Sequence, residues 1–221
     1  FTNRELQTLL NYGRAGVRGL MRAQRLALKG RGEFLIPLPR LVVATGNAHK
    51  LAELKGILGG VCDLVSMQEA GFDEDIAENG DTFEQNAAIK AEAVMKATGL
   101  PALADDSGLS VAALGGAPGV HSARYAGGHG DTEANNQLLL KNMESIENRD
   151  CKFVCAMALA LPGEQTRVVT GECEGTLLTA YRGDNGFGYD PLFLYGDGQT
   201  FAEMSEAAKN KVSHRAHAAE K

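Results

Sequence analysis

The stretch Ala102–Val111, ALADDSGLSV, places two adjacent carboxylates between apolar segments. The apolar residues on either side predict two short strands, 101–104 and 109–114, with Asp105 and Asp106 at the junction between them. These carboxylates admit two interpretations. Asp, Ser and Gly are frequent turn residues, because they bond to nearby backbone or permit unusual φ values. Carboxylate oxygens are also the ligands that hard cations such as Mg²⁺ prefer.

The composition of the chain is that of an ordinary folded protein. Of its 221 residues, 44% are hydrophobic and 23% are charged, a balance typical of globular domains with a sizeable core. No apolar run approaches the ~20 residues that a membrane span needs, and the N-terminus does not have the pattern of a signal peptide. The four cysteines form no C-x-x-C pair, which favours a reducing, cytoplasmic setting.

The net charge of −6 is unevenly distributed along the chain. Residues 1–40 carry eight Lys and Arg against two Asp and Glu, whereas residues 41–221 carry 14 against 26. This change predicts two units: a basic helix followed by a Pro-containing linker in 1–40, and one domain in 41–221. Because the larger unit is acidic, we expect no direct nucleic-acid binding and no broad nucleic-acid surface.

The domain begins with the pattern of a strand, a loop and a helix. LVVAT (41–45) is typical of a buried strand, GNAHK (46–50) of a turn, and LAELKGILGG (51–60) of a helix. The start of such a helix favours a bound phosphate, because its backbone N–H groups are free. The loop lacks the Walker A sequence, and many αβ units begin in this way.

A second helix is predicted with both of its ends marked. Thr82 and Gln85 have the spacing of a capping box, and Gly99 marks the end of the helix. Lys90 lies on the apolar face, where it either extends past the edge of the helix or points into a polar cleft and meets an anion. The acidic loop before this helix places Glu78 within reach of the same cleft.

The second half of the domain alternates strands with glycine-rich loops. Residues 152–163 and 166–177 predict a β-hairpin, and a helix is expected around 131–144. In the loop 183–195, Phe187 and Tyr189 either pack on the core or form a platform on which a nucleobase stacks.

The C-terminal segment brings four basic side chains together within seven residues. They are Lys209, Lys211, His214 and Arg215. A solvated helix is the ordinary interpretation of this pattern, and a cluster that contacts phosphate or base is the functional one. His214 and His217 share a helical face, but two histidines without a third ligand make a poor metal site.

Six motifs, taken in order, resemble the inosine triphosphate pyrophosphatase family over about residues 41–217. The motifs are TGNAHKLAEL, ENGDTFEQNAAIKA, ALADDSGLSV, LGGAPGVHSARY, FGYDPLF and KNKVSHR. The resemblance implies an elongated, two-lobed α/β domain with a central mixed sheet flanked by helices and a nucleotide cleft between the lobes. It also implies hydrolysis of ITP, dITP or XTP to the monophosphate and pyrophosphate, with Mg²⁺ and usually in a homodimer.

The same resemblance assigns roles to particular residues. Glu78 and Asp106 would bind Mg²⁺, and Asp106 would also be the base for the attacking water. The phosphates would be held by Thr45, Gly46, Asn47, Lys50 and Ser107. The purine and ribose would be enclosed by Phe187, Gly188, Tyr189, Asp190, Lys209, His214 and Arg215. Lys90 adds positive charge, which phosphoryl chemistry requires. On this interpretation Asp105 and Asp106 form a turn that presents a metal site.

The chain departs from the family pattern in two places, and its first unit resembles another family. Gln85 stands where the family often has Glu, and the chain ends soon after SHRAHAAEK, so we expect a shortened closing helix with a frayed end. Residues 1–29 resemble the C-terminal helix of ribonuclease PH, which implies a fused or associated domain of that kind. The competing hypothesis is a catalytically silent nucleotide-binding module attached to an RNA-processing enzyme.

Overall fold

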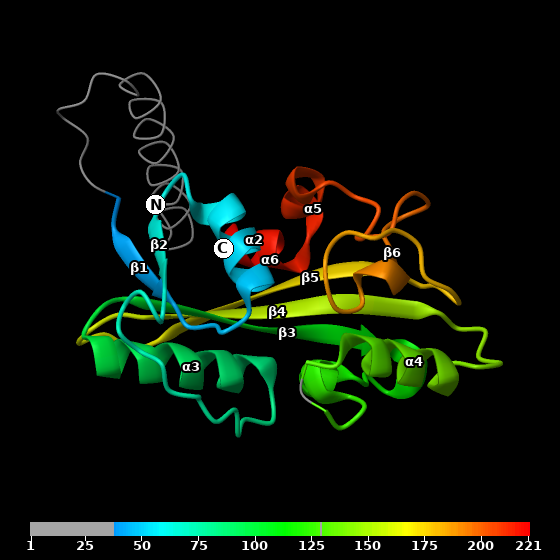
Figure 1. Cartoon of the computed structure of the whole chain (residues 1–221), viewed down its shortest axis with the longest axis horizontal. Coiled ribbons are helices and arrows are strands. Elements are labelled where there is room, and N and C mark those ends of the chain that lie inside the picture. Colours follow the sequence, from blue (N-terminus) through cyan, green and yellow to red (C-terminus); the bar gives the residue numbers. More distant parts are fainter. Residues whose placement is uncertain (1–37, 129) are drawn as a thin grey trace, which may run out of the picture.

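A six-stranded mixed β-sheet runs along the molecule, and helices cover both of its faces (Figure 1). This computed structural model describes residues 38–128 and 130–221. The predicted basic helix, most of the linker and the segment 1–29 that resembles ribonuclease PH lie outside the described residues. The prediction of an elongated α/β fold around a mixed sheet is confirmed.

The sheet combines a parallel half with an antiparallel half. The strands are β1 (Arg40–Val43), β2 (Asp63–Ser66), β3 (Ala102–Val111), β4 (Asp150–Ala160), β5 (Arg167–Leu177) and β6 (Phe193–Leu194). Their order is β2-β1-β3-β4-β5-β6; β1 pairs in parallel with β2 and β3, and the remaining pairs are antiparallel. The predicted hairpin is confirmed as β4 and β5.

Strand β3 corrects the prediction of two strands joined by a turn. It is continuous over Ala102–Val111, and Asp105 and Asp106 lie opposite Met157 and Ala156 of β4. Because side chains alternate along a strand, the two carboxylates point to opposite faces of the sheet. Each carboxylate has a cationic partner in the interior, so the strand passes through residues whose local preference is for a turn.

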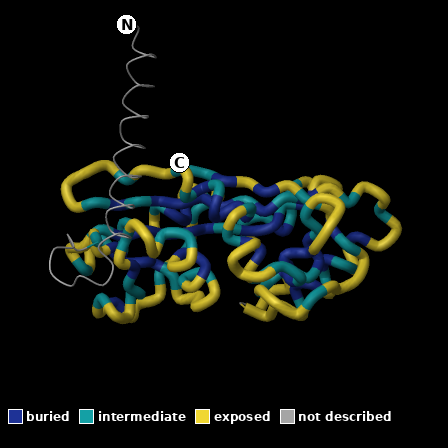
Figure 2. Tube along the Cα trace, turned by 90° about the horizontal axis from the view of Figure 1, so that it is seen from above, coloured by how far each residue is buried: buried dark blue, intermediate teal, exposed yellow. Residues whose placement is uncertain are grey.

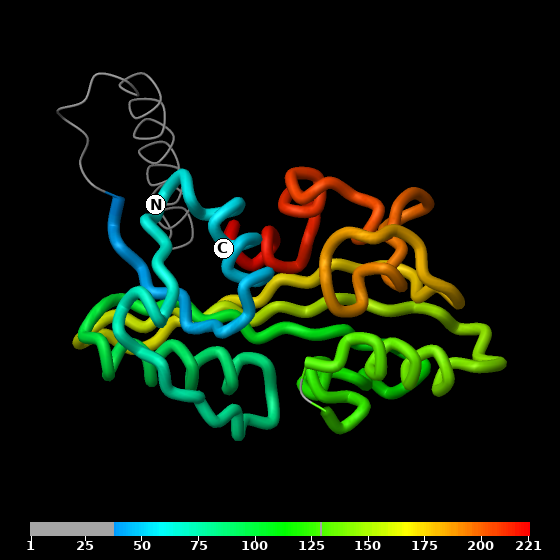
Figure 3. Tube along the Cα trace, in the orientation of Figure 1, coloured from blue at the N-terminus to red at the C-terminus, as the bar shows by residue number. Residues whose placement is uncertain are grey.

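The helices divide between the two faces of the sheet. They are α2 (Ala48–Leu58), α3 (Phe83–Thr98), α4 (Thr132–Asn142), α5 (Glu206–Val212) and α6 (His214–Ala219), with short 3₁₀ segments η1 (Ala112–Leu114), η2 (Gly119–Arg124) and η3 (Asp190–Leu192). In Figure 1, α3 and α4 lie on one side of the sheet and α2, α5 and α6 on the other. The trace in Figure 3 shows the C-terminal segment returning beside α2.

The core consists of three apolar clusters along the sheet. Alanines of α3 pack closely on alanines of β3 and β4, whereas α2 and α6 pack on the opposite face. At the far end, the ring of Phe153 stacks on that of Phe201, and the ring of Phe193 packs against both at a tilt. The burial map in Figure 2 shows the buried residues concentrated through the middle of the molecule and the exposed ones around its edge. No helix in the described residues is long and apolar enough to cross a membrane.

The predicted ends of α3 are confirmed by its hydrogen bonds. Thr82 Oγ1 accepts a bond from the backbone N–H of Gln85 at 3.2 Å, and Gln85 Oε1 accepts one from Asp81 N at 2.7 Å. Gly99 ends the helix with a φ of 70°, which glycine adopts without strain. The side chain of Gln85 therefore closes the start of the helix without a carboxylate.

Three of the four basic side chains of the C-terminal segment are buried, which corrects the expectation of a solvated helix for them, whereas Lys211 is exposed. Ser213 interrupts it with an extended backbone and caps α6 by accepting a bond from Ala216 N at 3.2 Å. Lys209, His214 and Arg215 are all buried. The closing helix α6 packs on β5 and β4.

Candidate active site

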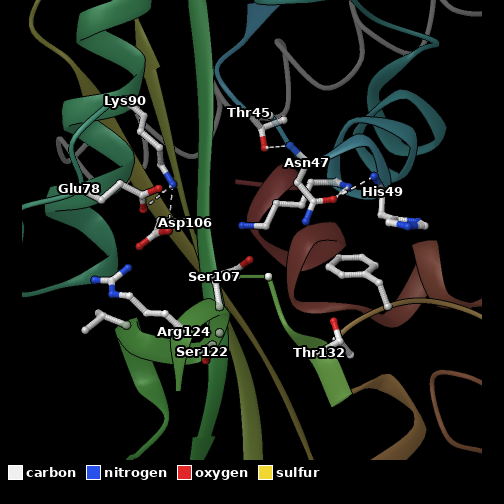
Figure 4. Close-up of a pocket in the computed structure, with 18 of the residues that line it drawn as sticks. Thr45, Asn47, His49, Glu78, Lys90, Asp106, Ser107, Ser122, Arg124 and Thr132 are labelled. Atoms are coloured by element: carbon white, nitrogen blue, oxygen red, sulfur yellow. Dashed lines mark hydrogen bonds and ion pairs between the residues drawn. The ribbon is translucent and has the colours of Figure 1, made fainter. Parts of the chain in front are cut away.

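A cavity of about 890 Å³ lies beside the middle of β3. One wall comes from the loop 45–50 and the segment around Glu78, and the other comes from η2, the start of α4 and the loop 187–190. Figure 4 shows labelled side chains of both walls converging on this space. Its volume is within the ~300–1,000 Å³ typical of sites for small molecules.

The predicted site residues come together at this cavity, with one exception. Lys209 does not line it, whereas the others do. Those others are Thr45, Gly46, Asn47, Lys50, Glu78, Lys90, Asp106, Ser107, Phe187, Gly188, Tyr189, Asp190, His214 and Arg215. Positions separated by up to 170 residues are therefore neighbours in the fold.

The loop at the start of α2 is shaped by its own side chains. Asn47 Oδ1 accepts bonds from His49 N at 2.9 Å and Lys50 N at 3.2 Å, which caps the helix. Thr45 Oγ1 accepts a bond from Asn47 N at 3.1 Å. These bonds hold the loop in one conformation and place the N-terminal end of α2 at the cavity.

A cation lies between two carboxylates on one wall of the cavity. Lys90 Nζ donates to Glu78 Oε2 at 3.0 Å and to Asp106 Oδ1 at 2.9 Å, as the dashed lines in Figure 4 show. Lys90 is only 8% exposed, so it points into a polar cleft and does not extend past the edge of the helix. Burial alone would lower the pKa of Lys90, but Asp106 and Glu78 raise it, so the ammonium stays charged.

The two carboxylates beside Lys90 differ in their affinity for protons. Burial alone would raise the pKa of Glu78, but Lys90 outweighs it and keeps that pKa low. Burial raises the pKa of Asp106 above its ordinary value in spite of Lys90. Two neighbouring carboxylates commonly divide in this way, and the one with the raised pKa is the better acceptor for a proton from water.

The donor set of Glu78 and Asp106 fits a magnesium ion that is shared with phosphates. No group of three or more His, Cys, Asp or Glu gathers to hold a metal in the part of the chain that the structure describes. Mg²⁺ needs no such group, because it is commonly bound by one or two carboxylates together with water and substrate phosphate oxygens. These two carboxylates line the cavity side by side, as that arrangement requires.

A network of buried ion pairs lies on the face of the sheet to which Asp105 points, and two of its members, Lys50 and Arg215, also line the cavity. Asp105 pairs with Lys50 at 2.6 Å and with Arg215 at 3.1 Å. Glu53, which the sequence analysis did not single out, pairs with both Arg215 and Lys209 at 2.7 Å. The donors of Lys209 and Arg215 are therefore largely engaged within the protein, although Arg215 also lines the cavity.

The loop 187–190 presents one aromatic ring to the cavity and buries the other. The Phe187 ring stacks on His49 with a centroid distance of 5.3 Å and an interplanar angle of 16°. Tyr189 belongs to the core cluster, and its hydroxyl donates to Ser122 O at 2.9 Å. Asp190 holds the loop by accepting bonds from Phe187 N at 2.8 Å and Lys209 Nζ at 2.6 Å. Tyr189 therefore packs on the core, one of the two predicted alternatives, whereas the ring of Phe187 can still serve as a platform on which a nucleobase stacks.

His214 is a buried, neutral side chain at the cavity. Its ring stacks on Phe153 at 4.8 Å, and its Nδ1 has no hydrogen-bond partner in the described residues. Burial, together with the nearby guanidinium of Arg215, holds the pKa of His214 well below its usual value. The imidazole is therefore uncharged at neutral pH, with one nitrogen left to bond with a ligand or water.

The cavity also contains residues that the sequence analysis did not assign. The side chain of Arg124 makes no hydrogen bond or ion pair within the described residues, and Figure 4 shows it extending toward Asp106. Its position in the HSARY motif was the available signal. Asn136 Nδ2 donates to Gly188 O at 3.1 Å and ties the loop 187–190 to α4. A polar residue in a helix gives no comparable signal.

Comparison with known proteins places the chain in a family. The Ham1 family matches residues 41–221. A dITP/XTP pyrophosphatase of Bacillus licheniformis is 48% identical over 188 residues, covering 83% of this chain and 96% of its own. One of Syntrophobacter fumaroxidans is 51% identical over 180 residues, covering 80% and 78%.

Solved structures have the same fold. A HAM1 protein from Coxiella burnetii superposes with a TM-score of 0.75 at 40% identity, covering 83% of this chain and 95% of its own. The Staphylococcus aureus Ham1 protein gives 0.74 at 38% identity, covering 82% and 94%. The chain described here belongs to the Ham1 family.

Proposed function

We propose that this protein hydrolyses non-standard purine nucleoside triphosphates (ITP, dITP and XTP) to the monophosphate and pyrophosphate. The observation that carries the proposal is the placement of Lys90 between Glu78 and Asp106, in the same cavity as the ring of Phe187. One end of the cavity offers groups for phosphoryl chemistry and the other offers a face for a base. Relatives that are 48% and 51% identical are named dITP/XTP pyrophosphatases, which supports the same substrate class.

The phosphates would lie between the loop 45–50 and the wall that carries Lys90. Lys50 and Lys90 supply positive charge, and the unpaired guanidinium of Arg124 adds more. Thr45, Gly46, Asn47 and Ser107 supply backbone and hydroxyl groups around them. Phosphoryl transfer depends mainly on such positioning and charge stabilisation.

We propose that Glu78 and Asp106 hold Mg²⁺ together with the substrate phosphates. When bound, the ion would neutralise phosphate charge and polarise a phosphoryl oxygen. Asp106 would accept a proton from the attacking water. The water oxygen bonds to phosphorus, the bond between the α- and β-phosphates breaks, and pyrophosphate leaves. Lys90 keeps Glu78 ionised throughout.

The base would lie at the end of the cavity formed by Phe187, Gly188 and His214. Phe187 offers a ring face, and the neutral imidazole of His214 offers a nitrogen that has no partner in the described residues. A site that hydrogen-bonds a 6-oxo purine rejects adenine, because its own polar groups would be left unpaired.

Pyrophosphate release from ITP, XTP, dITP, GTP and ATP at equal concentrations, with Mg²⁺ and with EDTA, tests the proposal. We expect metal-dependent release from ITP, XTP and dITP and little from ATP and GTP. A folded protein that binds these nucleotides but releases nothing would instead support the silent binding module. Equal release with EDTA would overturn the magnesium assignment.

We further propose that the protein acts in the cytoplasm as a homodimer, as the family resemblance implies. Light scattering coupled to size-exclusion chromatography measures the mass in solution, and a monomer at micromolar concentration would contradict the dimer.

A further inference from the structure

His49 and Phe187 approach each other across the mouth of the cavity from different parts of the chain. His49 lies in the first turn of α2, next to the loop proposed to hold phosphate, and Phe187 lies in the loop before η3. Both line the cavity. Their rings are nearly parallel, with centroids 5.3 Å apart, so each presents a flat face to the other.

The other neighbours of Phe187 cannot move aside. Lys209 Nζ lies 4.9 Å from the ring centroid, and the guanidinium carbon of Arg215 lies 5.5 Å from it. Both side chains are buried and hold ion pairs with Glu53. Separating either of them from its carboxylate would leave a charge buried without compensation.

His49 is held much less firmly. It is exposed, and within the described residues its ring makes no hydrogen bond or ion pair, while its backbone N–H donates to Asn47 Oδ1. Its one ring contact is the stack on Phe187. The face of Phe187 that His49 covers is therefore the face that a small side-chain movement can open.

We infer that His49 forms the second wall of the base slot, so that the purine inserts between its imidazole and the ring of Phe187. This inference rests on the proposed function, and it adds a residue that recognises the base. Two stacking contacts need a separation of about 7 Å between the outer rings. The present spacing of 5.3 Å must therefore widen by roughly 2 Å, which rotation of an exposed side chain supplies.

Stacking of the purine between the rings of His49 and Phe187 also explains why His49, which lies so near the phosphate loop, carries a ring. Stacking is tolerant of base identity, since every base has a π-face. His49 would therefore strengthen binding of all purine nucleotides, while selection of the 6-oxo group stays with polar groups at the base edge. The alternative is that His49 contacts phosphate directly, and the two roles differ in which ligand responds to substitution.

Calorimetric titration of the full chain with IMP and with pyrophosphate separates these roles. His49→Ala should weaken IMP binding about 5- to 50-fold and leave pyrophosphate binding within twofold. His49→Phe, which keeps a ring, should restore most of the IMP affinity. His121→Ala is the matched control, because His121 is exposed and does not line the cavity; its affinities should equal those of the unsubstituted protein.

Three results would overturn the inference. One is unchanged IMP binding in His49→Ala, and another is an equal loss for IMP and pyrophosphate. The third is tighter IMP binding in His49→Ala, which would mean that His49 blocks the platform. Because IMP binding is measured without turnover, an absence of ITP hydrolysis would count against the proposed function without deciding the role of His49. Where turnover is present, KM for ITP should rise in His49→Ala while kcat changes by less than about twofold.

Discussion

Asp105 and Asp106 are adjacent in β3, yet their carboxylates meet different lysines on opposite faces of the sheet. Asp106 Oδ1 lies 2.9 Å from Lys90 Nζ at the cavity, and Asp105 Oδ1 lies 2.6 Å from Lys50 Nζ. Asp105 is fully buried, whereas Asp106 lines the cavity. The same residue type therefore has two roles, and substitution should separate them.

Replacing Asp106 by Asn should abolish catalysis without unfolding the protein. Asn keeps the size of the side chain but neither accepts a proton from water nor provides an anionic ligand, so pyrophosphate release from ITP should fall at least ~100-fold. Calorimetry should still detect ITP binding, because the other groups around the phosphates remain. Release within tenfold of the unsubstituted rate would contradict the assignment of Asp106 as base and ligand.

Replacing Asp105 by Asn should mainly reduce stability. Burial alone would raise the pKa of Asp105, but Arg215 and Lys50 outweigh it and hold that pKa well below its ordinary value. Removing one partner of a buried ion pair commonly costs about 3–5 kcal/mol, and urea denaturation should show a loss in the free energy of unfolding of this order.

The matched control for Asp105 is Asp63→Asn. Asp63 forms an exposed pair with Arg40 at 3.3 Å, and such pairs contribute at most about 1 kcal/mol. Similar losses in the two variants would show that the network around Asp105 does not hold the fold together.

Local signals in the sequence predicted most of the fold. The ends of α3 are set by Thr82, Gln85 and Gly99, which act within a few residues of their own positions, and the prediction there was confirmed. The hairpin of β4 and β5 was equally local. The motifs also identified most of the residues that line the cavity, because each motif carries its polar groups in a short run.

Long-range contacts account for what the sequence did not reveal. Asp105 and Asp106 continue a strand only because Lys50, Lys90 and Arg215 arrive from distant segments to neutralise them. Lys209 and Arg215 are likewise buried because Glu53, more than 150 residues earlier, pairs with both of them. Such partnerships have no local pattern, so a charged run was assigned to solvent.

The free energy of unfolding should decrease as the pH is lowered below about 6.5, because of His214. Its pKa is lowered well below 6.5 in the folded protein, first by burial and then by Arg215. Between the folded pKa and 6.5 the unfolded chain therefore binds a proton that the folded protein does not, and the free energy of unfolding falls by up to about 1.4 kcal/mol per pH unit.

The comparison of His214→Gln with the unsubstituted protein isolates this contribution. Urea denaturation from pH 7 to pH 5 should show a smaller decrease in the free energy of unfolding for the variant. The difference in slope should correspond to the uptake of about one proton per molecule on unfolding. The difference between the two proteins cancels the carboxylates, whose own pKa shifts they share. Parallel profiles would mean that His214 is protonated in the fold.

Gly171 allows α6 to lie directly on β5, and filling that contact should displace the base end of the cavity. A Cβ at Gly171 would collide with backbone atoms of His214, His217 and Ala218, which cannot yield as a flexible side chain would. Gly171→Ala should therefore cost about 1–3 kcal/mol of unfolding free energy and raise KM for ITP, because His214 moves with α6. Gly60→Ala is the control: a Cβ there meets no atom within 4 Å, so stability and KM should stay unchanged. If Gly171→Ala lost stability while KM stayed constant, the position of α6 would not control the base end of the site.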